Sequence, residues 1–194
     1  MSLDGWGGDE RWAEEAGARN ADRSRIARVT GQERDRWSIQ GEDGSRPARV
    51  PSAGGIDPLP VTGDWVVVEP GPEPADPWSL LEVLPRRSKI SRGVAGTGQA
   101  EQVLAANVDK VWIVHGLDTE LNLRRIERYL TVVWESGASP EIILAKADLA
   151  KDLEAELSAV QGVAMGVTVR SVSSTDAESV QGLRGTLVPG STIC

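Results

Sequence analysis

The sequence of 194 residues has no phenylalanine, and it has one cysteine, one histidine and one tyrosine. Because Cys194 is alone, an internal disulfide framework and a cysteine-based metal site are excluded, and we expect a reducing, cytoplasmic setting. No apolar run approaches the roughly 18 residues that a membrane-spanning helix needs, and we see no signal peptide, so we expect no membrane partner. Seven tryptophans supply the aromatic bulk of a core.

The sequence also lacks the phosphate-binding loop of nucleotide hydrolases. That loop ends in a glycine followed by lysine, and the four lysines here follow serine, aspartate or alanine instead. The formal net charge of −8 argues against broad, non-specific binding of nucleic acid. The acidic excess is uneven, however, because residues 24–92 carry ten residues of each sign.

Two regions with different patterns precede the middle of the chain. Residues 1–23 are rich in glycine, alanine and charge, and we expect a mobile tail with a marginal helix near 10–18. Residues 24–85 show short apolar stretches separated by turn residues, which favours a five-stranded barrel of the oligonucleotide-binding (OB) type. The expected strands are 25–30, 36–40, 47–50, 64–69 and 79–84.

A barrel of this type often binds RNA through stacked bases and phosphate contacts. Trp37, Trp65 and Trp78 are candidates for stacking, but a tryptophan in so small a barrel more often lies in its core. Trp37 is our candidate RNA contact among the three.

A cluster of cations follows the last expected barrel strand and begins a basic, glycine-rich segment at 86–98. Only hydroxyl and apolar residues separate the cations, so the cluster suits a phosphate backbone. The alternative interpretation is a solvated linker between domains. The residues of the cluster are Arg86, Arg87, Lys89 and Arg92.

From residue 99 the apolar pattern changes to alternating strands and helices, which predicts a parallel sheet with right-handed crossovers. The first three strands are expected at 108–115, 141–144 and 167–172, and the first two helices at 123–134 and 149–160. A helical face at 180–187 and the beginning of a fourth strand at 191–194 come after the third strand.

An ionisable pair, Lys146 and Asp148, directly follows the second of these strands, at the carboxyl end where open α/β sheets bind ligands. A carboxylate there can accept two N–H bonds from the N1–H and amine edge of guanine, which adenine does not present. The alternative interpretation is a helix-capping aspartate beside a solvated lysine. Ser173 and Ser174 end the third strand at the same edge, where they could line the same base.

Five short motifs occur in order along residues 24–194. They are Gly63-Asp-Trp-Val66, Leu84-Pro-Arg-Arg-Ser88 with Arg92, Gln102 with Ala105-Ala-Asn-Val-Asp109, Arg128-Tyr-Leu130, and Ala145-Lys-Ala-Asp-Leu149. In this order they resemble the circularly permuted GTPases, specifically the ribosome-small-subunit-dependent GTPase A family (RsgA, also YjeQ). The resemblance implies that 99–194 is part of a GTPase domain that holds the guanine-specificity elements G4 and G5. The implied base-binding residues are Ala145, Lys146, Ala147, Asp148, Ser173 and Ser174.

The resemblance implies GTP hydrolysis coupled to maturation of the small ribosomal subunit, with guanine nucleotide, that subunit and its 16S rRNA as partners. Two departures matter: Ala145 stands where the family has Asn or Thr, and the phosphate loop is missing. We therefore expect an amino-terminal portion of such a protein, without catalytic residues, metal ligands or the family's zinc site. We expect this portion to bind Mg²⁺ only where a phosphate loop is also present, and to be inactive alone. The alternative is a noncatalytic RNA- or protein-binding barrel with a nucleotide-domain remnant.

Overall fold

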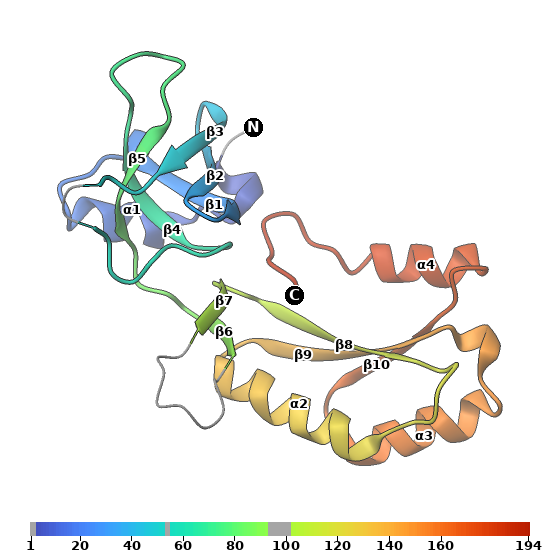
Figure 1. The fold of residues 1–194 in the computed structure, drawn as a ribbon. Helices are drawn as coiled ribbons and strands as arrows, with labels where there is room; N and C mark the ends of the chain where they lie inside the picture. Colours follow the sequence, from blue (N-terminus) through green and yellow to red (C-terminus); the bar gives the residue numbers. More distant parts are fainter. Residues whose placement is uncertain (1–2, 53–54, 93–101) are drawn as a thin grey trace. The chain divides into compact units, whose positions relative to one another are not determined.

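The structure is a computed structural model that describes residues 3–52, 55–92 and 102–194 (Figure 1). The chain forms two compact units, Met1–Val108 and Asp109–Cys194, and each has its own sheets. Within the described residues, no helix is long and apolar enough to cross a membrane.

The first unit contains a closed five-stranded barrel with the strand order β1-β2-β3-β5-β4, in which β1 also pairs with β4. This confirms the OB-type barrel expected from the sequence. Inward-facing Ala27, Val29, Ile39 and Leu80 form its core because side chains alternate between the two faces of each strand. The strands are β1 (Ile26–Glu33), β2 (Arg36–Gly41), β3 (Gly44–Arg49), β4 (Trp65–Glu69) and β5 (Trp78–Val83).

The amino-terminal segment differs from the expected mobile tail. A short 3-10 helix (Leu3–Trp6) and helix α1 (Glu10–Gly17) pack on the barrel. The Trp12 ring is 1% exposed and stacks on Trp65, with ring centroids 5.4 Å apart. A few large apolar side chains therefore order a segment that its polar composition predicted to be mobile.

A second, two-stranded sheet of β6 (Lys89–Arg92) and β7 (Gln102–Ala106) also belongs to the first unit. The sequence analysis placed β6 in a linker and β7 in the second domain. Residues 93–98 of the expected linker lie outside the described residues.

The second unit has a three-stranded parallel sheet with the order β10-β9-β8, which confirms the predicted α/β pattern. Helices α2 and α3 lie on one side of this sheet and α4 lies on the other (Figure 1). The elements are β8 (Lys110–Gly116), α2 (Leu123–Ser136), β9 (Ser139–Ala145), α3 (Leu153–Val163), β10 (Thr168–Val172) and α4 (Ala177–Arg184).

Capping residues set the helix limits in this unit. Helix α2 starts after Asn122, whose side chain accepts a bond from the Arg125 N–H, and it ends at Gly137, which adopts a φ of 85°. Helix α3 begins later than predicted because the Asp152 side chain caps it, accepting from the Ala155 N–H at 3.0 Å. The preceding Ala147–Leu149 forms a 3-10 turn instead.

The open edge of β8 carries the last residues of the chain. Ile193 forms a parallel bridge with Lys110, and the Trp112 N–H donates to the carbonyl oxygen of Cys194 at 2.8 Å. The pairing agrees with the fourth strand that the sequence predicts to begin at 191–194.

Candidate functional site

The three parallel strands of the second unit end at one edge of their sheet. Gly116, Ala145 and Val172 are neighbours in register across β8, β9 and β10. The residues that follow each strand therefore meet at this edge, as ligand-binding residues of open α/β sheets do. We call this edge the strand-end site.

Lys146 follows β9 in the left-handed conformation, with a φ of 56°. Its ammonium group forms an ion pair with the carboxylate of Asp118, which follows β8. The Lys146 side chain lowers the pKa of Asp118 by hydrogen bonding to its ionised form. The sequence analysis missed Asp118; the only available signal was its place two residues after a strand.

Gly116 leaves the room that this ion pair needs. A Cβ atom at Gly116 would lie 2.6 Å from Oδ1 of Asp118 and 3.7 Å from Cδ of Lys146. A larger residue at the end of β8 would therefore push the two charged side chains apart.

Asp148 lies in the Ala147–Leu149 turn and is exposed. Its Oδ1 atom accepts a hydrogen bond from the hydroxyl of Ser173, which follows β10 and is 5% exposed. The structure thus brings together two of the residues that the sequence predicts for base binding. An ionised carboxylate offers about four acceptor positions, so capacity remains for a ligand.

Hydrogen bonds with the following loop and with helix α4 fix Ser173 in turn. Its backbone N–H donates to Oγ of Ser179 at 3.2 Å, and its own Oγ accepts from the backbone N–H of Thr175 at 3.2 Å. Ser174, the other predicted serine, is exposed beside them.

Two of the predicted positions bring no polar side-chain atom to the site. Ala145 ends β9, and Ala147 begins the turn that holds Asp148. Any contact from these positions to a ligand must come from the backbone or the methyl group. Among the described residues, no group of three His, Cys, Asp or Glu side chains could hold a metal ion.

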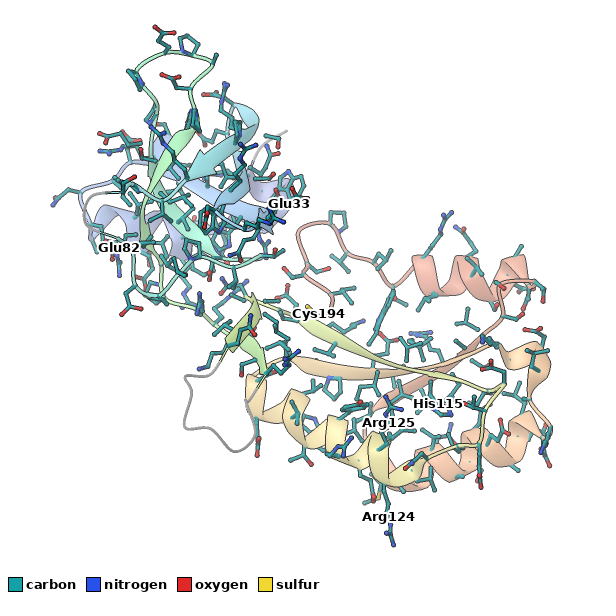
Figure 2. The ribbon with its side chains drawn as sticks, in the orientation of Figure 1. Glu33, Glu82, His115, Arg124, Arg125 and Cys194 are labelled. Carbon is teal, nitrogen blue, oxygen red and sulfur yellow. The ribbon has the colours of Figure 1, made fainter. Side chains whose placement is uncertain are left out.

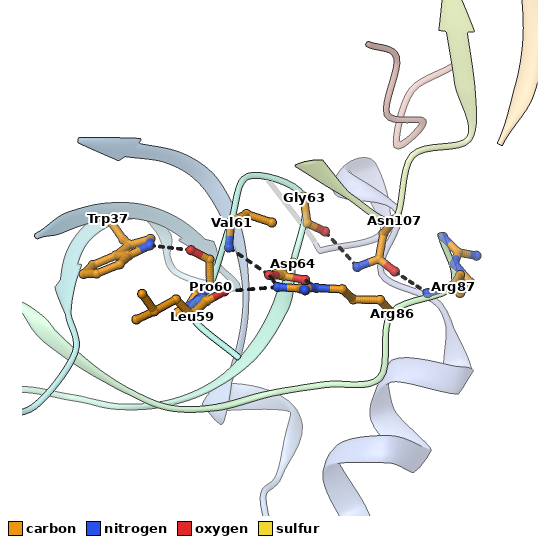
Figure 3. A network of polar contacts seen from close by, with 9 residues as sticks. All are labelled: Trp37, Leu59, Pro60, Val61, Gly63, Asp64, Arg86, Arg87 and Asn107. Atoms are coloured by element: carbon orange, nitrogen blue, oxygen red, sulfur yellow. Dashed lines mark hydrogen bonds and ion pairs between the residues drawn. The ribbon is translucent and has the colours of Figure 1, made fainter. Parts of the chain in front are cut away.

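The predicted cationic cluster lies in the first unit, and its first residue, Arg86, is bound to a buried carboxylate. Arg86 forms a paired contact with Asp64, from Nε to Oδ1 at 2.8 Å and from Nη2 to Oδ2 at 2.7 Å (Figure 3). Asp64 is 0% exposed and also accepts from the Val61 N–H at 2.8 Å. The Asp64 carboxylate raises the pKa of Arg86 through this hydrogen bonding. Arg86 is therefore part of a buried polar network in this structure.

Asn107 extends the network toward β6 and β7. Its side chain donates to the Gly63 carbonyl at 3.0 Å and accepts from the Arg87 N–H at 2.9 Å (Figure 3). A Cβ atom at Gly63, where φ is 92°, would collide with the carbonyl oxygen of Ala106. We call this set of contacts around Asp64, Arg86 and Asn107 the Asp64 network.

The other predicted RNA contacts are divided between core and surface. Trp37 is 5% exposed in the barrel core, and its Nε1 donates to the Pro60 carbonyl at 2.9 Å (Figure 3). The Arg87 guanidinium lies 5.3 Å from the centre of the Trp12 ring. Arg87, Lys89 and Arg92 are exposed, the last two on β6.

Comparison with known proteins decides the family. The model of the RsgA GTPase family matches residues 83–194. The chain belongs to the RsgA GTPase family. This confirms the resemblance found in the motifs of the sequence.

Two curated relatives are named as small ribosomal subunit biogenesis GTPases of the RsgA family. The chain is 39% identical to RsgA 1 of Oceanobacillus iheyensis over 158 residues, covering 79% of this chain and 45% of that protein. It is 36% identical to RsgA of Streptomyces coelicolor over 197 residues, covering 99% of this chain and 53% of that protein. The chain thus spans about half the length of these RsgA relatives.

A solved structure supports the fold. The crystal structure of YloQ, a circularly permuted GTPase, matches with a TM-score of 0.59 at 20% sequence identity. The match covers 81% of this chain and 54% of that protein. The barrel followed by a parallel sheet is therefore an arrangement that this RsgA-family chain shares with a known GTPase.

Proposed function

We propose that this chain supplies the guanine-recognition and RNA-contacting parts of a GTPase that acts in biogenesis of the small ribosomal subunit. The observation that carries the proposal is the contact between Asp148 and Ser173 at the strand-end site. It joins two segments, 25 residues apart, that the family resemblance assigns to base recognition.

Guanine recognition follows from the chemistry of this edge. Asp148 can accept the N1–H and the exocyclic amine of guanine, and the hydrogen bond from Ser173 orients the carboxylate for this contact. Adenine would leave the carboxylate unpaired, which makes it the weaker ligand. The stem of Lys146, held by Asp118, can lie along the face of the base.

Hydrolysis needs groups outside this site. Phosphoryl transfer depends on a phosphate loop, its lysine and Mg²⁺, and residues 1–194 contain no glycine–lysine step. We therefore expect these residues alone to bind GTP only at millimolar concentration or more weakly, because each net hydrogen bond to the base contributes about 1 kcal/mol. We expect no GTP hydrolysis by residues 1–194 in isolation.

RNA contact is assigned to the cations of the first unit. The small ribosomal subunit and its 16S rRNA are the proposed partners, and Arg87, Lys89 and Arg92 are the proposed phosphate contacts. Arg86 contributes by holding this segment against the barrel through Asp64. Trp37 supports the barrel from within, because its ring lies in the core.

Ala145 favours a second candidate function. With a methyl group where the family has an amide or hydroxyl, the site loses a side-chain contact to the nucleotide. A noncatalytic RNA- or protein-binding module that keeps a nucleotide-domain remnant would have this property.

A titration followed by NMR distinguishes the two candidates, since it detects millimolar binding. We expect GTP and GDP to shift the amide signals of residues 146–149 and 173–175 more than ATP does, and Asp148→Asn to remove this preference. Glu154→Gln, an exposed neutralisation on α3, is the matched control and should leave the preference unchanged. Equal shifts with all three nucleotides would favour the noncatalytic module. Micromolar guanine-selective binding would show that residues 1–194 contain a phosphate site, against our expectation.

A further inference from the structure

The outer surface of α2 in the second unit has an unusual set of charged and aromatic side chains. Arg124, Arg125 and Arg128 are exposed within the first two turns of the helix. Figure 2 shows Arg124 projecting from the start of the helix, away from the sheet. No proposed role in base binding or in the cationic cluster of the first unit involves these residues.

Two of these arginines contact one aromatic ring. The guanidinium carbons of Arg125 and Arg128 lie 5.4 Å and 5.5 Å from the centre of the Tyr129 ring. The Nε of Arg125 also donates to the Tyr129 hydroxyl at 3.1 Å, and this bond lowers the pKa of Tyr129. The three side chains thus form one preorganised cluster on the helix surface.

Although the exposed Glu127 lies on the same helix, the arginines of this cluster differ in their pairing from several other arginines in the part of the chain that the structure describes. None of Arg124, Arg125 and Arg128 forms an ion pair there. Other arginines of this acidic chain do pair with carboxylates, namely Arg19, Arg23, Arg25, Arg86, Arg87 and Arg170. The α2 cluster is therefore a local positive surface on a chain whose net charge is −8.

Helical spacing places the cluster on one stripe. Arg125, Arg128, Tyr129 and Val132 follow the pattern i, i+3, i+4 and i+7, on a stripe that runs beside the buried face of Ile126, Leu130 and Val133. Tyr129 and Val132 are the exposed apolar side chains of this stripe, and the exposed Trp134 lies off it, so α2 does not present the continuous apolar stripe that docking of a partner helix needs. The surface suits an anionic ligand that also carries planar aromatic rings able to stack.

We propose that this α2 surface binds single-stranded RNA, with Arg125 and Arg128 contacting phosphates and Tyr129 stacking a base. Guanidinium groups bind phosphate with two parallel N–H donors, and exposed tyrosine and arginine planes stack unpaired bases. The choice of RNA over an acidic protein rests in part on the proposed function, whereas the cluster itself stands on the contacts above. The surface lies outside the cationic cluster of the first unit.

The test uses the full chain, a fluorescent 12-nucleotide oligouridine and a salt series, without any guanine nucleotide. Replacing Arg125→Gln and Arg128→Gln together should weaken binding about tenfold at low salt and lower the slope of log K against log salt by about 1.4. Tyr129→Leu should weaken binding about three- to tenfold, and Tyr129→Phe should restore it, because the ring is what stacks. Circular dichroism checks that each variant remains folded.

Lys151→Gln with Arg184→Gln is the matched control, because it removes two exposed charges from the same unit. An equal loss in this control would overturn the proposal in favour of net charge alone. Absence of oligouridine binding by the unmodified chain would also overturn it. Polyglutamate serves as a probe for an acidic protein partner: if the double arginine variant lost binding to polyglutamate but kept binding to oligouridine, the RNA proposal would be wrong. Since the assay contains no guanine nucleotide, each result is independent of guanine recognition.

Discussion

The two units use aspartate in opposite ways. In the first unit Asp64 is fully buried, and its carboxylate accepts three hydrogen bonds, two from Arg86 and one from Val61. In the second unit Asp148 is exposed at the ends of parallel strands, and one hydrogen bond from Ser173 orients it. A buried carboxylate whose hydrogen bonds all come from its own unit stabilises the fold, whereas an exposed and oriented one has acceptor positions that a ligand can reach.

Glu141 shows that position within a unit matters as much as the unit itself. It lies in β9, close to the strand-end site in sequence, yet it is 2% exposed. Its carboxylate binds Lys110 at 2.8 Å, Arg170 at 2.5 Å and the Trp112 ring nitrogen at 3.1 Å. Because Glu141 is buried and its partners belong to its own unit, it is a structural residue like Asp64. The comparison can therefore be tested on Asp64, Glu141 and Asp148.

The largest effect is expected from Asp64→Ala. This change removes the carboxylate and leaves Arg86 partly buried without its partner, so it should lower the free energy of unfolding by about 3–5 kcal/mol. Urea unfolding measures the loss. The exposed Glu33→Ala is the control and should change stability by less than about 0.5 kcal/mol. A loss of that small size for Asp64→Ala would refute the structural role of the Asp64 network.

Glu141→Gln should have a smaller effect that depends on pH. Burial alone raises the pKa of Glu141, but hydrogen bonds from Lys110, Arg170 and Trp112 outweigh it and hold the pKa below its usual 4.5. The ionised group therefore stabilises the folded state above about pH 4.5, and this contribution is lost as the pH falls through the folded pKa.

Thermal or urea unfolding across pH tests this sign. The Gln variant should be less stable than the original by about 1–3 kcal/mol near pH 7, and the difference should shrink below about pH 4.5. A difference that is constant down to pH 3, or one that grows on acidification, would contradict the assignment.

The predictability of these residues from sequence depends on how far apart their partners lie. Alternation within a few residues marked all five barrel strands to within a few positions. Trp12 and Trp65 lie 53 residues apart, and their contact is what orders the amino-terminal segment. No local pattern reports such a pair, so the sequence analysis expected a mobile tail.

The strand-end site was partly predictable for the same reason. Lys146, Asp148 and Ser173 follow apolar strands, and parallel strands bring such positions together. Asp118 was missed because it lies two residues past the end of β8, and its contact with Lys146, 28 residues away, leaves no local pattern in the sequence. The β6–β7 sheet was missed because its strands are short and β6 is mostly polar, so neither shows the apolar alternation that marks a strand.

Asp118→Asn should have the smallest effect of these changes. The variant loses its charge pairing with Lys146, but both side chains are well exposed, so the melting temperature should not change measurably. Guanine-induced NMR shifts should weaken about two- to threefold, because the lysine is no longer held beside the base. A lower melting temperature with unchanged shifts would assign this ion pair to stability instead.

The most direct test compares Asp64→Asn and Asp148→Asn in two measurements on the full chain, the free energy of unfolding and the ratio of GTP-induced to ATP-induced NMR shifts. The account predicts that Asp64→Asn lowers stability by about 2 kcal/mol or more while the folded protein keeps its guanine preference. It predicts that Asp148→Asn leaves stability unchanged and abolishes the preference. If Asp148→Asn destabilised the chain and kept the guanine preference, the division between structural and ligand-binding carboxylates would be wrong.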